Sequence, residues 1–305
     1  MRIVVVSPER IAMISNVTVD SGNGRIVVSF MANGAPYVAK FGKGGRDLLA
    51  KEGNRKIEKG SSRLQFTANL SLFPHVVPGL AGGGNLCPSA TKACVASCVA
   101  HNGNGLIPNV QLARIARRLA YTGAKTEFIS ILDLELSQLN RVASWFDKPV
   151  GVRLNTFSDL PWEHMLDLGK FDSLRFYDYS KVWKRSGGHL GNGKIIHRNY
   201  RICFSCIGVD DDWQRIGDYL EVGGSVACVF ADSFNPGLTR WAYSQQLPKE
   251  FMGFKVVDGD RTDDRFHDRK GVIVGLRLKA RSWNNFDYAV SEGFAIDWRN
   301  VQIAN

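Results

Sequence analysis

The chain has 305 residues, of which 44% are hydrophobic and 22% are charged, and this composition excludes an intrinsically disordered protein. Its 39 Lys and Arg against 29 Asp and Glu give a formal net charge of +10, which favours a polyanionic partner such as nucleic acid but also fits a basic enzyme without one. Six cysteines are too few for a disulfide-built scaffold and indicate a reducing compartment. No apolar run reaches about 18 residues and no leader pattern opens the chain, so we expect a cytoplasmic protein without a membrane partner.

The first 44 residues carry short β-like runs. These runs lie at residues 3–6, 25–30 and 37–41, and the last two are separated by the turn-forming pair Asn33-Gly34. We therefore predict an antiparallel β meander over residues 1–44. The glycine-broken basic stretch at residues 42–60 is typical of a surface loop, which either connects two parts of the chain or contacts phosphate.

Beyond residue 62, helix and strand patterns alternate. Apolar residues recur at helical spacing over residues 111–121 and 127–145, and short buried-strand runs lie at residues 150–155, 174–177, 226–230 and 272–276. This alternation is typical of an α/β protein with a parallel sheet. We predict a TIM-like βα barrel over residues 45–305, which forms a catalytic domain with cysteine-rich metal-binding insertions.

Five of the six cysteines fall into two sequence clusters, Cys87, Cys94 and Cys98 followed by Cys203 and Cys206. Thiolates bind zinc or hold iron–sulfur clusters, and both need close spacing plus a distant ligand that completes the site. We predict that the five thiols form one metal centre, either zinc or a [4Fe–4S] cluster, and the alternative is that they only pack in the core. We expect Cys228 to be a core residue and His101 to lie on a surface loop.

Four aspartates are candidates for catalysis, namely Asp159, Asp178, Asp232 and Asp260. The first three directly follow strand-like runs, where the catalytic groups of parallel βα proteins lie, and the fourth belongs to an acidic turn. Neighbouring carboxylates push their pKa values apart, so that one can act as nucleophile and the other as acid or base. This pairing fits cleavage at a glycosidic carbon. The alternative for each aspartate is a helix cap or a turn residue.

Aromatic and polar residues beside these aspartates are candidates for binding a planar base. We predict that Phe157 and Tyr177 stack on the base and that Arg153, Asn155 and Lys181 bind substrate. The predicted phosphate contacts are Arg114, Arg117, Arg118, Lys184, Arg185 and Arg198. The alternatives are core packing for the aromatic residues and a solvated surface for the basic ones.

Several ordered motifs resemble the phage family called gene product 88. They are the run from residue 87 to 98, residues 153–159 with Trp162-Glu163, residues 176–181 and residues 271–277, and together they span about residues 54–282. The resemblance implies a phage or prophage setting, and so the cytoplasm of a bacterial host. Family members usually have an aromatic residue after the third cysteine and a richer second cysteine group, where this chain has Val99 and two cysteines.

Two further similarities concern architecture. A basic βα barrel with aspartates at strand ends and cysteine-bound zinc is similar to the transglycosylases that exchange guanine for a 7-deazaguanine, although no motif aligns. The cysteine loop also looks like that of radical S-adenosylmethionine barrels, with spacers of six and three residues in place of three and two.

We therefore hypothesise a phage-encoded DNA guanine transglycosylase. Asp159 or Asp232 would attack or stabilise the sugar C1′ of DNA, a second aspartate would move the proton, and zinc would be structural. The first alternative is an iron–sulfur radical enzyme that uses a [4Fe–4S] cluster with S-adenosylmethionine. The second is a zinc-stabilised, non-enzymatic DNA-binding or host-takeover protein. The sequence predicts no oligomeric state.

Overall fold

The structure is a computed structural model and describes residues 12–51, 63–77, 79, 84–101, 103–186, 197–232, 246–279 and 283–300. The predicted strand at residues 3–6 and residues 52–60 of the basic stretch lie outside the described residues. None of the described helices is long and apolar enough to cross a membrane.

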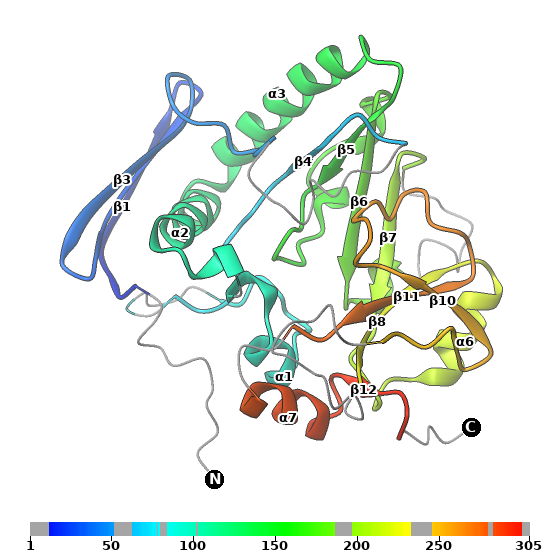
Figure 1. Ribbon diagram of the computed structural model, residues 1–305. Coiled ribbons are helices and arrows are strands. Elements are labelled where there is room, and N and C mark those ends of the chain that lie inside the picture. Colours follow the sequence, from blue (N-terminus) through cyan, green and yellow to red (C-terminus); the bar gives the residue numbers. More distant parts are fainter. Residues whose placement is uncertain are drawn as a thin grey trace.

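An N-terminal antiparallel sheet is confirmed, and two of its strands match the predicted runs at residues 25–30 and 37–41, whereas its first strand lies at residues 14–22, where no strand was predicted. Strands β1 (Ile14–Gly22), β2 (Arg25–Ala32) and β3 (Ala35–Gly42) form an antiparallel three-stranded sheet. Both turns need a positive φ at two successive residues, which the Asn-Gly pairs supply: Asn23 has φ 54° and Asn33 has φ 48°. Alternate side chains of β2 are buried against α2 (Pro108–Gly123) and α3 (Lys125–Ala143), which lie beside this sheet in Figure 1.

The second sheet is mostly parallel and confirms the α/β class. Six parallel strands lie side by side in chain order: β4 (Thr67–Asn69), β5 (Val150–Arg153), β6 (Leu174–Ser180), β7 (Tyr200–Ser205), β8 (Ser225–Ala231) and β11 (Val272–Arg277). Beyond β11 the sheet continues with parallel β10 (Phe254–Asp258) and antiparallel β9 (Glu250–Phe251). The short strand β12 (Ile296–Asp297) pairs with the carboxyl end of β8.

Helices cover one face of this sheet. α2 and α3 pack over β4 to β6, and α6 (Trp213–Glu221) packs over β7 and β8. Shorter helices lie at the strand ends: α1 (Lys92–Ala96), η2 (Val99–His101), η3 (Gly103–Leu106), η4 (Trp162–His164), η5 (Leu168–Lys170), α4 (Trp183–Ser186) and α7 (Trp283–Ser291). One hydrophobic core runs from β2 through α2 and α3 to β6, so the meander and the larger sheet share buried side chains.

The described strands form an open sheet, which corrects the prediction of a closed barrel. Its path runs from β4 at one edge to β9 at the other, and no pairing joins these edges in the described part of the chain. The face without helices is covered by the segment from 259 to 271, which connects β10 to β11. Asp263 of this segment accepts a hydrogen bond from Arg153 at 2.7 Å, and Arg265 is 3% exposed. Buried charged groups therefore occupy the space that layered apolar side chains fill in a TIM barrel.

Candidate functional site

The carboxyl ends of the parallel strands meet at one end of the sheet, where ligands bind in open α/β proteins. The chain from residue 84 to 101, which follows β4 and carries the first cysteine cluster, packs against this end. The backbone N–H of Asp159, which follows β5, donates to the carbonyl of Leu86 at 2.8 Å. The Cys87 thiol in turn donates to the carbonyl of Phe157, with an Sγ–O distance of 3.1 Å. These two contacts fix the cysteine loop to the loop after β5.

The second and third cysteines lie on and after α1. Thr91 caps this helix, because its Oγ1 accepts a hydrogen bond from the backbone N–H of Cys94 at 3.1 Å. Helix α1 packs against α7 beside the ends of β8 and β11. Cys87, Cys94 and Cys98 are all partly exposed. The first sequence cluster therefore gathers at the carboxyl end of the sheet and reaches solvent.

The thiols sit in a poorly solvated environment with one cation nearby. Burial raises the pKa of Cys87, and the charges of Cys98, Asp159 and Cys94 raise it further. Burial also raises the pKa of Cys94, whereas the charge of Lys181 lowers the pKa of both thiols. Without a bound cation, Cys87 and Cys94 are therefore neutral thiols at neutral pH.

Lys181 links three strand ends around the thiols. Its backbone N–H donates to Asp159 Oδ2 at 2.9 Å. Its ammonium group donates to the Cys206 carbonyl at 2.6 Å and to Ser205 Oγ at 3.2 Å. It also lies 5.4 Å from the centre of the Phe294 ring. The predicted substrate-binding Lys181 thus lies beside the cysteine loop with its charge held in place.

Asp159 belongs to a buried ion-pair network. Its Oδ1 pairs with Arg185, which is 6% exposed and also pairs with Glu163 through two hydrogen bonds of 2.7 and 2.9 Å. Arg185 further donates to the Tyr200 hydroxyl at 3.1 Å. Bidentate pairing of this kind is strong and directional. Asp159 and Arg185, predicted as nucleophile and phosphate contact, are therefore partners of each other in one buried network.

Asp178 is buried beneath the loop after β5. It accepts hydrogen bonds from the Asn155 backbone N–H at 2.7 Å, from Asn155 Nδ2 at 3.2 Å and from the Tyr200 hydroxyl at 2.9 Å. Burial raises the pKa of Asp178 to about 7, although Arg185 lowers it. Asn155 also accepts hydrogen bonds from Ser158 and Trp162. The predicted substrate ligand Asn155 and the predicted catalytic Asp178 thus hold this loop in shape.

The other two candidate aspartates are paired as well. Asp232, which is fully buried, accepts a hydrogen bond of 2.8 Å from Arg299. Asp260 accepts a hydrogen bond of 2.6 Å from the Lys279 ammonium group, and its other oxygen lies 3.4 Å from the Arg277 guanidinium. All four predicted catalytic carboxylates therefore have cationic partners or several donors inside the protein.

The predicted base-stacking residues are engaged in the fold. Tyr177 is fully buried, and its hydroxyl lies 3.4 Å from Asp263 on the face without helices. Arg153 pairs with the same carboxylate at 2.7 Å. Phe157 lies at the carboxyl end, where the Arg114 guanidinium sits 4.1 Å from its ring centre. Of this group, only Phe157 lies beside the thiols.

The predicted phosphate contacts divide between interior and surface. Arg118 is fully buried and donates to the carbonyls of Phe73, His75 and Gly84. Arg117 donates to the Leu48 carbonyl at 3.0 Å. Burial lowers the pKa of Arg114 to about 10, although the charge of Cys98 raises it. The exposed members of the set are Lys184 and Arg198. Arg118 has no surface on which to contact a phosphate.

The remaining cysteines do not join the first three. Cys203 lies on the face without helices and packs against Ala227 and Val274. Cys206 lies in the core beneath α6, where its Sγ is 3.3 Å from that of Cys228. In the described part of the chain, no group of three or more His, Cys, Asp or Glu side chains is close enough to hold one metal ion. Cys203 and Cys206 thus lie in different hydrophobic clusters, and the five thiols do not gather at one point among the described residues.

Two residues have partners that the sequence did not indicate. His101, predicted to lie on a surface loop, is 2% exposed and its ring centre lies 5.3 Å from that of His75. Cys228, expected in the core, is there, but it contacts a second thiol. The thiol that Cys228 contacts belongs to Cys206. The Cys-x-x-Cys pattern at residues 203–206 could not reveal this contact, because Cys228 lies on the next strand.

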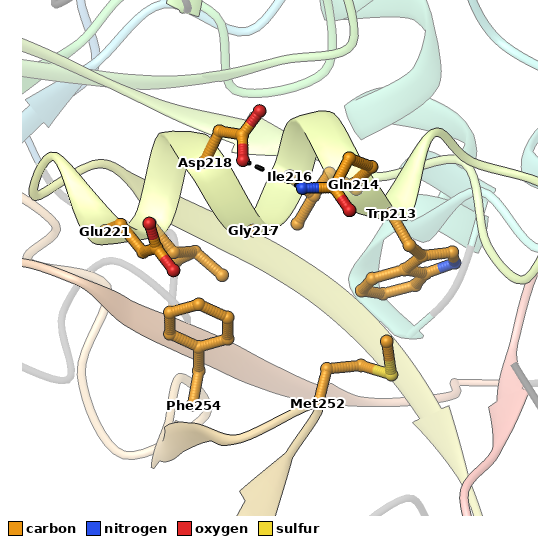
Figure 2. A pocket seen from close by; sticks show the side chains of 9 residues that line it. Trp213, Gln214, Ile216, Gly217, Asp218, Glu221, Met252 and Phe254 are labelled. Atoms are coloured by element: carbon orange, nitrogen blue, oxygen red, sulfur yellow. Dashed lines mark hydrogen bonds between the residues drawn. The ribbon is translucent and has the colours of Figure 1, made fainter. Parts of the chain in front are cut away.

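A surface cavity of about 160 Å³ lies elsewhere, between α6 and the turn that joins β9 to β10. Figure 2 shows Met252 and Phe254 facing the helix, and Gln214 bonded to Asp218 at 3.0 Å. Its described lining contains no thiol and none of the predicted site residues. The three thiols of the first cysteine cluster therefore lie outside this cavity.

The fold and the site define an α/β protein whose mostly parallel sheet carries three thiols at its carboxyl end. The model of the gene product 88 family matches residues 43–297, and the chain belongs to this family. The match confirms the resemblance to this phage family drawn from the ordered motifs. No curated protein and no solved structure matches the chain, so the similarity to the transglycosylases gains no support.

Proposed function

We propose that the protein is an iron–sulfur enzyme in which Cys87, Cys94 and Cys98 hold a [4Fe–4S] cluster and leave one iron open for S-adenosylmethionine. One observation carries this proposal: the three thiols follow the first of six parallel strands in chain order and lie together at the carboxyl end of the sheet. Ligands and cofactors of parallel βα proteins bind at that end.

The chemistry of the three thiols fits such a cluster. Burial keeps Cys87 and Cys94 protonated in the absence of a cation, and iron can replace those protons because coordination deprotonates a thiol. Lys181, fixed by Ser205 and Cys206, offsets part of the negative charge that thiolates bring. All three thiols are partly exposed, which gives iron and a small molecule access.

A cluster and a single zinc ion make different demands on the spacing of the thiols. Zinc needs four ligands converging on one point. In a cluster each thiolate binds a different iron, so the thiols stand further apart. Among the described residues, no three candidate ligands converge closely enough for one ion. The electrostatic influence of Cys94 and Cys98 on Cys87 nevertheless indicates that the three are neighbours.

When bound, the cluster supplies one electron for reductive cleavage of S-adenosylmethionine. The residues of this chain position the site. The Phe157 carbonyl holds the Cys87 thiol, and the Arg114 guanidinium lies against the Phe157 ring beside Cys98. The Asp159–Arg185 pair fixes the loop that carries Phe157. These contacts give the cysteine loop a defined shape before iron binds.

The hypothesis of guanine exchange has less support from the geometry. It needs a carboxylate that is free to attack the sugar, and Asp159, Asp178, Asp232 and Asp260 all bind donors within the protein. Nucleic acid remains our proposed substrate class, on the basis of the net charge of +10.

The test is anaerobic reconstitution with iron and sulfide. We expect about four irons and four sulfides per chain, with the visible absorption of a cluster. Cys87→Ser, Cys94→Ser and Cys98→Ser should each lose most of this iron. Cys203→Ser is the matched control, because it removes a buried thiol outside the group, and it should load iron like the wild type.

Enzyme activity is tested on the same samples. The reduced, reconstituted wild type should convert S-adenosylmethionine to methionine and 5′-deoxyadenosine, as measured by liquid chromatography and mass spectrometry. The three serine variants at the carboxyl end should not. One zinc per chain without labile sulfide would contradict the proposal, and so would equal iron loss in the Cys203→Ser control.

A further inference from the structure

A basic cavity lies at the opposite end of the sheet from the thiols. It has a volume of about 140 Å³ and lies between the amino ends of β7 and β8, the end of α6 and the segment from 259 to 271. β7 pairs with β8 only through Phe204 and Ser205, so the first half of β7 borders this cavity instead of a strand. Four of its eleven described lining residues are cationic, none is acidic, and the four are Arg198, Arg201, Arg265 and Lys270.

Arg265 anchors this basic cavity. Its side chain is 3% exposed, one Nη donates to the Thr262 carbonyl, and the other lies 3.1 Å from Asp268. Its Nε has no hydrogen-bond partner among the described residues. A buried guanidinium with an unsatisfied donor is costly unless another group accepts its proton. An anion in the cavity would supply that acceptor.

The other three cations are not held by a close carboxylate as Arg265 is. Arg198, Arg201 and Lys270 form no ion pair with any described residue, and the Arg201 guanidinium lies over the Phe266 ring at 5.3 Å. Asp268 lies near both Arg265 and Arg201, and its single negative charge cannot balance the four positive charges of the cavity. Like charges gathered around a small cavity repel each other, and a bound anion removes that repulsion.

We propose that this cavity binds a phosphate group. Guanidinium groups match the geometry of phosphate oxygens and bind them through paired hydrogen bonds. The cavity is smaller than the roughly 300–1,000 Å³ that encloses a drug-sized ligand, so it fits one phosphate group and not a whole nucleotide. The phosphate can belong to a small ion or to the end of a nucleic-acid strand.

Calorimetric titration of the full chain tests this proposal. The probes are inorganic phosphate, pyrophosphate, and one short single-stranded oligonucleotide with either a 5′-phosphate or a 5′-hydroxyl, all at one salt concentration. We expect Arg201→Gln and Lys270→Gln each to weaken phosphate binding by about tenfold, since a hydrogen bond to a charged group contributes that much. Arg269→Gln is the control, because Arg269 is exposed, does not line the cavity and carries the same charge. It should change the affinity by less than about twofold.

The probes separate the two sources of phosphate. Binding of phosphate or pyrophosphate identifies a small ion, whereas preference for the 5′-phosphorylated oligonucleotide identifies a strand end. The proposal is overturned if no phosphate probe binds the wild type, or if Arg269→Gln weakens binding as much as the cavity variants. Iron plays no part in these titrations, so their outcome is independent of cluster reconstitution.

Discussion

At the carboxyl end of the parallel sheet, the buried aspartates meet cations and backbone donors inside the protein, whereas at the amino end Arg198, Arg201 and Lys270 form no close ion pair with a described residue. The carboxyl end therefore uses its charges to hold loops in place, and the polar groups left available there are thiols. The amino end keeps positive charge available to a ligand. The comparison shows that position at a strand end does not make a charged residue reactive, because its partners decide whether it is available.

The largest expected effect comes from breaking the ion-pair network at the carboxyl end. Arg185→Met leaves Asp159 and Glu163 without their shared partner, and an unpaired buried charge costs about 3–5 kcal/mol. The free energy of unfolding, measured by urea denaturation, should fall by that amount. Lys184→Met is the control, since Lys184 is exposed, and it should stay within about 0.5 kcal/mol of the wild type. Equal stability of the two variants would mean that the network is not structural.

Sequence patterns were sufficient to locate the helices and strands whose apolar residues recur regularly. Periodicity located α2 and α3, and apolar runs located β5, β6, β8 and β11. β7 was missed because Arg201, Cys203 and Ser205 alternate with its apolar residues, so that the sequence shows no continuous apolar run. Barrel closure was wrongly predicted, since the sequence does not reveal that the segment from 259 to 271 crosses one face of the sheet.

The sequence indicated where part of the candidate site lies, but not which of its residues are available for chemistry. The sequence placed Asp159 directly after a predicted strand, and in the structure this residue lies there, beside Lys181 and the first cysteine cluster. The partners that neutralise the charged residues come from distant positions: Arg153 and Asp263 are 110 residues apart. Local sequence patterns carry no information on such distant pairs. The sequence therefore did not reveal that the predicted catalytic residues already have partners inside the protein.

A second, smaller effect concerns pH and the loop that carries the thiols. Burial lowers the pKa of His75 from 6.5 to about 4, so the folded protein keeps this ring neutral where the unfolded chain binds a proton. His75 therefore contributes stability that is present above pH 6.5 and is lost as the pH falls to about 4, with a total of about 3 kcal/mol. The raised pKa of Asp178, at about 7, acts in the opposite direction over the same range.

The His75→Phe variant isolates this contribution, because an aromatic ring is retained and Asp178 is unchanged. The difference in unfolding free energy between the wild type and the variant should rise with pH between about 4 and 6.5. Urea titrations at several pH values measure it. A difference that does not vary with pH would show that His75 titrates normally in the folded protein.

The smallest expected effect tests how firmly the thiols are held compared with the ion pairs around them. Helix α1 has five residues, and the Thr91 hydroxyl that caps it accepts the N–H of Cys94. Thr91→Ala should cost about 1 kcal/mol locally and speed the loss of iron to a chelator about fivefold, whereas Thr91→Ser retains the cap and should behave as the wild type does. Unchanged iron loss in Thr91→Ala would mean that packing of α1 against α7, and not the cap, positions Cys94. The thiol loop would then resemble the ion-pair network, with tertiary contacts and not local ones setting its geometry.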